Sequence, residues 1–194
     1  MLRDAILETL QAQDLATAAV ARSTGLACPP NCGRCCDNPA IEALPLEMIP
    51  LARRLTAEAA AGNTESAAII AEARNPDSTW DVCAIYDHHG GGKGRCRRYE
   101  ERPSLCRLFG YSGWLNEFGR PQFSACFHHG AIQPEEVKRA SLLTAAQGVS
   151  LPLHEEVDEA LIATGRQYGV PTELLERKPI NEALRLALDW VLPG

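Results

Sequence analysis

Residues 28–36 read CPPNCGRCC and hold four of the eight cysteines of this 194-residue chain. The remaining four are Cys83, Cys96, Cys106 and Cys126, so cysteine is confined to the stretch between residues 28 and 126. Core cysteines placed at random would not leave both ends of the chain empty. The clustering therefore indicates that the eight residues act together at one site.

Three roles are open to these cysteines. Free cysteine is often a buried apolar residue, but the segment 28–36 is polar and rich in the turn residues Pro, Asn and Gly. The even count permits four disulfides, although disulfides are rare in a reducing compartment and a chain of this length needs no covalent crosslinks. The third role, binding of a metal ion or an iron–sulfur cluster by thiolates, is the one we favour. The predicted metal ligands are Cys28, Cys32, Cys35, Cys36, Cys83, Cys96, Cys106 and Cys126.

The spacing within 28–36 suits metal binding. The spacing Cys28-x3-Cys32-x2-Cys35 lets the three sulfurs surround one centre. Gly33 lies between them, where a glycine can adopt a left-handed backbone at little energetic cost. The adjacent pair Cys35-Cys36 is expected to diverge towards two nearby ions or two corners of a cluster. The sequence therefore predicts a polynuclear or two-centre site, with an iron–sulfur cluster as the cofactor and zinc as the alternative.

Basic residues gather near the second set of cysteines, although the whole chain is acidic. The basic residues between Cys83 and Arg107 are Lys93, Arg95, Arg97, Arg98, Arg102 and Arg107, and Arg34 adds to them. Nearby cations lower thiol pKa values and stabilise an anionic cluster. The alternatives are a solvated arginine face or a small anion-binding patch.

Tyr99, Arg102 and Arg107 are the residues that we expect to bind the cofactor beside the cysteines. Arginine can donate hydrogen bonds to cluster sulfurs and tune their chemistry. The alternative for these arginines is a salt bridge to Glu100 or Glu101.

Two histidine pairs, at 88–89 and 128–129, each lie close to a cysteine in the sequence. An imidazole can replace a thiolate as a ligand. Histidines in polar loops usually face solvent, however, and eight thiolates already suffice for two four-coordinate centres.

Outside the cysteine region the apolar periodicity is helical. It predicts helices over residues 2–22, 46–61, 64–74, 154–168 and 180–191, and a further helix beginning at Pro134. Residues 77–130 are expected to form loops with short strands at 82–86 and 122–125. The predicted fold class is mainly α, with helices packed around an irregular, metal-stabilised cysteine-rich centre and at most short strands. We expect a single domain over 1–194, in which a C-terminal helical region, 131–194, packs on the cysteine-cluster region, 28–130.

Composition and charge exclude several classes of protein. The chain is 45% hydrophobic and 23% charged, which argues against a disordered chain. A net charge of −6 argues against sequence-independent binding to nucleic acid. The apolar runs are shorter than the roughly 18 residues that span a bilayer, and the N-terminal stretch does not resemble a secretory signal. The predicted location is cytoplasmic, without a nucleic-acid or membrane partner.

A second motif lies at residues 94–107, which read GRC-x2-YE-x-RP-x2-CR and follow the CPPNCGRCC segment. This two-part pattern resembles the YkgJ-type cysteine-cluster family of zinc- or iron-chelating domains with eight cysteines. All eight cysteines here find a counterpart, with Cys83 upstream of the Gly-x-Cys element and Cys126 as the last. The first spacing is one residue longer than in the form with two intervening residues, and the loop 90–94 looks like an insertion.

The resemblance implies metal chelation, and some family members look like iron–sulfur proteins. The predicted function is a metal-binding cysteine-cluster protein acting in electron transfer, metal handling or redox modification. One alternative is a zinc-stabilised module that binds another protein. The other is an enzyme that modifies a peptide or protein side chain, because a flagellin lysine N-methylase resembles this family through its cysteine motif. The partner would then be a protein or a peptide substrate, and no catalytic residue is assigned.

Overall fold

The computed structural model describes residues 1–38, 41–75, 77–78, 82–91 and 93–192. Over these residues the fold is mainly helical, as predicted, with short antiparallel strand pairs. The helices are α1 (Leu2–Thr24), α2 (Pro45–Ala60), α3 (Thr64–Ala73), α4 (Ser104–Leu108), α5 (Phe127–Ile132), α6 (Pro134–Ala145), α7 (His154–Gln167) and α8 (Ile180–Val191). The strand pairs are β1 (Glu42–Ala43) with β6 (Lys178–Pro179), β2 (Tyr86–Gly90) with β3 (Lys93–Cys96), and β4 (Ser112–Leu115) with β5 (Pro121–Ser124). Within the described ranges, no helix is both long and apolar enough to cross a bilayer.

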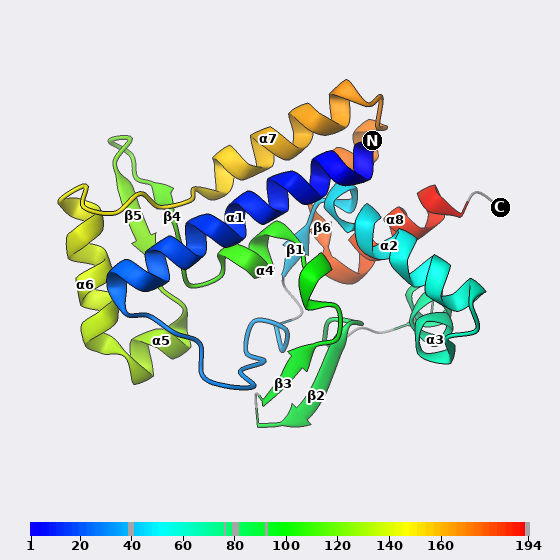
Figure 1. The fold of residues 1–194 in the computed structure, drawn as a ribbon, viewed down its shortest axis with the longest axis horizontal. Coiled ribbons are helices and arrows are strands. Elements are labelled where there is room, and N and C mark those ends of the chain that lie inside the picture. Colours follow the sequence, from blue (N-terminus) through cyan, green and yellow to red (C-terminus); the bar gives the residue numbers. More distant parts are fainter. Residues whose placement is uncertain (39–40, 76, 79–81, 92, 193–194) are drawn as a thin grey trace.

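Two groups of helices form the body of the molecule. α1 and α7 run side by side along one edge, and α8 packs against α2 and α3 (Figure 1). Their apolar faces meet in one cluster whose fully buried members include Leu10 of α1, Leu55 of α2 and Leu188 of α8. Burial of each such side chain stabilises the fold by about 1.5–3 kcal/mol. The β2–β3 hairpin and the chain after α1 lie on the other side of α1 from α7 (Figure 1).

The predicted helices are confirmed. The apolar stripe of α8 is buried from Ile180 to Leu188, as its 3.6-residue periodicity indicates. The spacing within 154–168 predicts a buried face of Val157, Ala160, Leu161, Thr164 and Tyr168, of which only Leu161 is buried. On α7 the buried positions are Leu161 and Gly165, whereas Ala160 and Tyr168 are exposed. The cause is a close approach, because a Cβ built on Gly165 would lie 2.5 Å from Leu175 and 2.9 Å from Leu46. The glycine therefore turns this face of α7 inwards.

The predicted strand at 82–86 is wrong over most of its length. The strand begins only at Tyr86, whose N–H donates to the Cys83 carbonyl in a turn (2.9 Å). The side chain of Asn181 explains the difference, because its amide donates to the Val82 carbonyl and its oxygen accepts from Ala84 N–H, both at 2.8 Å. A side chain of α8 thus satisfies backbone groups that a neighbouring strand would otherwise pair. The other predicted strand, at 122–125, is present one residue earlier.

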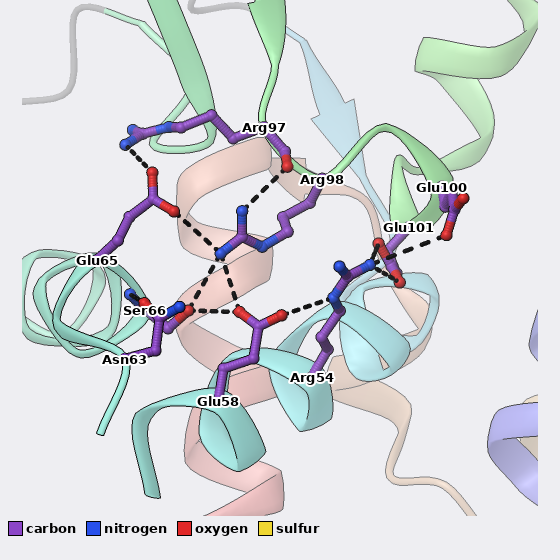
Figure 2. A network of polar contacts seen from close by, with 9 residues as sticks. All are labelled: Arg54, Glu58, Asn63, Glu65, Ser66, Arg97, Arg98, Glu100 and Glu101. Carbon is purple, nitrogen blue, oxygen red and sulfur yellow. Dashed lines mark hydrogen bonds and ion pairs between the residues drawn. The ribbon is translucent and has the colours of Figure 1, made fainter. Parts of the chain in front are cut away.

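A polar network joins α2 and α3 to the chain just after Cys96. Figure 2 shows the Arg98 guanidinium between Glu58, Glu65 and Ser66, and its Nη2 lies 2.9 Å from Glu58 Oε2. On the other side of Glu58, Arg54 donates to Oε1 (2.8 Å) and also binds Glu101 (2.7 Å). The network therefore fixes the segment 97–101 on the two helices.

We predict that Glu58→Gln reduces the amount of unfolding free energy that the protein loses when the pH falls from about 4.5 to about 2. Hydrogen bonds from Ser66, Arg54 and Arg98 lower the pKa of Glu58 to about 2, against about 4.5 for a free side chain. A carboxyl with a lowered pKa stabilises the fold above pH 4.5, and this contribution is lost as the pH falls towards 2. Urea unfolding at a series of pH values should show a smaller loss between these limits in the variant than in the wild type. The exposed Glu8→Gln is the control, and equal profiles for Glu58→Gln and Glu8→Gln would contradict the prediction.

Candidate metal centre

All eight cysteines line one cavity of about 1080 Å³, and all eight are free thiols. Separate parts of the chain supply them. Residues 28–36 follow α1, Cys83 precedes β2, Cys96 ends β3, Cys106 lies in α4 and Cys126 caps α5. The structure thus brings together residues that are up to 98 positions apart in the sequence.

The start of the cysteine segment is anchored to the helices α5 and α6. α1 ends at Gly25, whose left-handed backbone (φ 81°) turns the chain away from the helix. The Gln133 side chain then bonds both backbone groups of Ala27, with an N–H···O distance of 3.0 Å from Ala27 to Gln133 Oε1. Tyr111 Oη accepts the N–H of Cys28 at 3.0 Å. These contacts hold Cys28 close to α5.

The middle of the cysteine segment docks on the β2–β3 hairpin through Tyr86. A Cβ on Gly33 would lie 2.1 Å from Tyr86 Oη, and a Cβ on Gly94 would lie 2.4 Å from Tyr86 Cε2. The left-handed backbone expected at Gly33 is found instead at Asn31 (φ 57°), a residue type that tolerates it. Gly33 is therefore required for the close approach of the tyrosine and not for a left-handed turn.

The electrostatic interactions of Cys28 and of Cys106 with the other sulfurs divide the sulfurs into two groups that share Cys35. Burial raises the pKa of Cys28, and the neighbouring thiolates of Cys32, Cys35 and Cys126 raise it further. Burial likewise raises the pKa of Cys106, followed by the thiolates of Cys83, Cys35 and Cys96. We call Cys28, Cys32 and Cys126 the outer thiols, and Cys35, Cys36, Cys83, Cys96 and Cys106 the inner thiols. Cys35 stands between the two groups.

The adjacent pair Cys35-Cys36 lies closer than the sequence suggests. Their sulfurs are 4.0 Å apart, near the edge of about 3.8 Å that two thiolates span on one tetrahedral zinc ion with Zn–S bonds of about 2.3 Å. The hydrogen bond between the two sulfurs lowers the pKa of Cys35 to about 7 and raises the pKa of Cys36.

The donor set fits zinc or iron, because both metals bind thiolates. Within the described part of the chain, no three Cys, His, Asp or Glu side chains yet converge on one point as an ion would require. The fold thus supplies eight soft ligands around a shared cavity, without a closed coordination shell.

The three residues expected to bind a cofactor also line the cavity, but they bind one another and α1. Arg107 has only 1% of its side chain exposed; it pairs with Asp14 and donates to the carbonyls of Glu100 and Arg102. Arg102 pairs with Asp14 at 2.7 Å and stacks on the Tyr99 ring at 3.7 Å. The ion-pair partner is therefore Asp14, and not the side chain of Glu100 or Glu101.

Arg102 is also the arginine whose positive charge acts on two of the inner thiols, Cys96 and Cys35. Burial raises the pKa of Cys96, and the positive charge of Arg102 opposes that rise. The same charge contributes to the lowered pKa of Cys35. Other arginines of the basic run are paired with carboxylates, Arg95 with Asp87 and Arg98 with Glu58. The basic cluster expected from the sequence is thus largely neutralised by local acids.

The two histidine pairs have different surroundings. His88 and His89 are exposed and lie beside Asp37 and Asp87. His129 is fully buried, and its Nε2 lies 3.6 Å from Cys28 Sγ. Burial lowers the pKa of His129, which favours the neutral imidazole.

Two carboxylates that make contacts around the site, Asp14 and Glu47, are not among the site residues predicted from the sequence. Asp14, in the middle of α1, binds arginines 88 and 93 residues away. Glu47 is fully buried, and its oxygens accept the N–H groups of Leu44 (2.9 Å) and Ser104 (2.5 Å), which links α2 to the start of α4. No local pattern marks partners at such separations, so the sequence carried no signal for either contact.

Comparison with known proteins gives a match to one family model over the cysteine region. Residues 27–138 match the family model CxxCxxCC, whose description is "Putative zinc- or iron-chelating domain". No curated protein and no solved structure matches. The matched segment covers more than half of the chain and includes all eight cysteines. This chain belongs to the CxxCxxCC family of zinc- or iron-chelating domains.

Proposed function

We propose that this chain is an iron–sulfur protein that holds its cluster with the inner thiols. The observation that supports this proposal most directly is that eight free thiols line one cavity, and five of them, the inner thiols, interact electrostatically with one another. Iron–sulfur clusters are held by four cysteine thiolates, so the inner thiols provide a full set. A cluster bound there would supply one-electron transfer.

The surroundings of the inner thiols suit an anionic redox centre. Cys83 is buried, which limits contact with water, and Arg102 brings a positive charge to Cys35 and Cys96. Burial, charge and hydrogen bonds to sulfur set the potential of such centres. Asp14 keeps Arg102 in place and reduces the local excess of positive charge. The roles that we propose are electron transfer, metal handling or redox modification of another molecule, in the cytoplasm, where thiols stay reduced.

A zinc-stabilised module that binds another protein is the second candidate. It is supported by the β4–β5 hairpin, where Trp114 and Leu115 are each 45% exposed and Phe118 is 76% exposed. Exposed apolar side chains on one hairpin are a feature of surfaces that contact a partner. In this candidate the metal would be structural and the hairpin would carry the function.

Metal analysis of anaerobically purified protein separates the two candidates. We expect a coloured protein with iron and acid-labile sulfide, and Mössbauer spectra of tetrahedral, sulfur-ligated iron. A colourless protein with stoichiometric zinc would contradict the iron–sulfur proposal and favour the module. Protein that holds neither metal after anaerobic loading would contradict both.

A further inference from the structure

We infer that His129 is a ninth ligand, which completes with the outer thiols Cys28, Cys32 and Cys126 a mononuclear centre of three sulfurs and one nitrogen. The inference rests on the proposed metal binding, but it does not depend on whether the inner thiols hold an iron–sulfur cluster.

The distance between Cys28 and His129 is that of two ligands on one ion. Their Sγ and Nε2 atoms are 3.6 Å apart. A tetrahedral zinc ion with a Zn–S bond of about 2.3 Å and a Zn–N bond of about 2.0–2.1 Å separates its sulfur and nitrogen ligands by about 3.5–3.6 Å. The pair therefore needs no rearrangement of its spacing to share an ion.

Helix α5 places Cys126 and His129 on one side. Cys126 is the N-cap and His129 is three residues further on, a separation at which side chains are neighbours on a helix. Both meet at Gly110, where an added Cβ would lie 2.9 Å from Cys126 Cβ and 3.0 Å from His129 Nδ1. Gly110 has φ +82°, so a larger residue would be strained there in addition to clashing. The cysteine and the histidine thus occupy one confined site.

The imidazole itself has an incomplete set of partners. His129 is 0% exposed, and its Nδ1 has no hydrogen bond within the described residues. Its Nε2 faces the Cys28 sulfur, and the ring packs edge-on against Tyr111 at 5.4 Å. An ion beside Cys28 would bind Nε2, while Nδ1 on the other side of the ring lies against Gly110, as the second nitrogen of a metal-binding imidazole commonly faces a backbone group.

The three outer thiols leave one position of a four-coordinate centre for a further ligand, for which Cys35 and His129 are the candidates. A structural zinc ion takes four ligands, and the outer thiols supply three. Cys35 interacts electrostatically with both groups, but its hydrogen bond to Cys36 places it with the inner thiols. Of the histidines near the cysteines, His88 and His89 are exposed beside carboxylates, whereas His129 touches an outer thiol. His129 therefore fills the fourth position.

Cobalt(II) is the probe that tests this assignment on the full chain, because its d–d bands move to higher energy when nitrogen replaces a sulfur ligand. Metal-free wild type and three variants are titrated with Co²⁺ without oxygen, and bound cobalt is counted for each. His129→Gln should lose one cobalt equivalent or bind it at least about tenfold more weakly. The neighbouring His128→Gln, which changes a half-buried side chain of the same helix, should match the wild type. His129→Cys should keep the cobalt and shift its bands to lower energy.

The outcomes separate this inference from the proposed function. Wild-type stoichiometry and spectrum in His129→Gln would overturn the inference and leave metal binding intact. Unchanged bands in His129→Cys would also overturn it, even if His129→Gln failed to fold. A wild-type chain that bound no cobalt would overturn the proposed metal binding itself.

Discussion

Replacing Cys36 with serine is expected to lower the metal content and to destabilise the fold by several kcal/mol. Cys36 lies among the inner thiols, 4.0 Å from Cys35 and within the electrostatic reach of Cys106 and Cys83. Structural metal binding contributes roughly 10–16 kcal/mol in small zinc domains, and weakening it weakens folding by linkage. Cys35→Ser should behave in the same way, because Cys35 interacts with both groups of thiols.

The loss should reach the helices as well as the site. Cys36, Cys96 and Cys106 pack against the main apolar cluster, which contains the buried faces of α2 and α8. Metal per chain and urea unfolding measure the two effects, and the same comparison after metal removal is the control, since the difference between wild type and variant should then largely vanish. Full metal loading with unchanged unfolding in both variants would refute this prediction.

Asp14→Ala is expected to cost about 3 kcal/mol of unfolding free energy. It would leave Arg107, whose side chain is 1% exposed, as an uncompensated buried charge and would also release Arg102. Breaking a buried pair from one side costs roughly 3–5 kcal/mol. Asp14 itself is 38% exposed, so solvent screening places the effect at the low end of that range.

The matched control for Asp14→Ala is Asp4→Ala on the same helix, where the aspartate is 56% exposed. Substitutions at such exposed positions usually change the unfolding free energy by less than about 0.5 kcal/mol. A second comparison pairs Asp14→Leu with Arg107→Met, because replacing both charges by apolar groups should recover part of the lost stability. If the two alanine variants unfolded at the same urea concentration, the arginines would not depend on Asp14.

The helices were predictable because their signals are local. α1, α2, α3 and α8 have apolar periodicity, and Asn63 caps α3 by accepting the N–H of Ser66, as expected of an Asn–Thr start. α4 and α5 have five and six residues, too few for a periodic pattern, so the sequence predicts loops where they lie. The false strand at 82–86 shows the limit most clearly, since an amide on α8 decides its conformation.

The site was predictable in its residues but not in its internal arrangement. Cysteine spacing alone selects eight side chains that do line one cavity. The division into outer and inner thiols depends on where α4 and α5 lie, and the buried position of His129 depends on its contact with Cys28, 101 residues away. His128 and His129 are equivalent in the sequence, and only tertiary packing makes one buried and the other half-buried.

Tyr86, held between Gly33 and Gly94, has a consequence for affinity. This contact joins the cysteine segment 28–36 to the β2–β3 hairpin without a metal ion. The entropy of closing a loop of about fifty residues is therefore already lost before an ion binds. The ligands are therefore already close together when an ion binds, so their effective concentration is high, as in a preorganised chelator. A short peptide copied from residues 28–36 should therefore bind the same ion far more weakly than the intact chain.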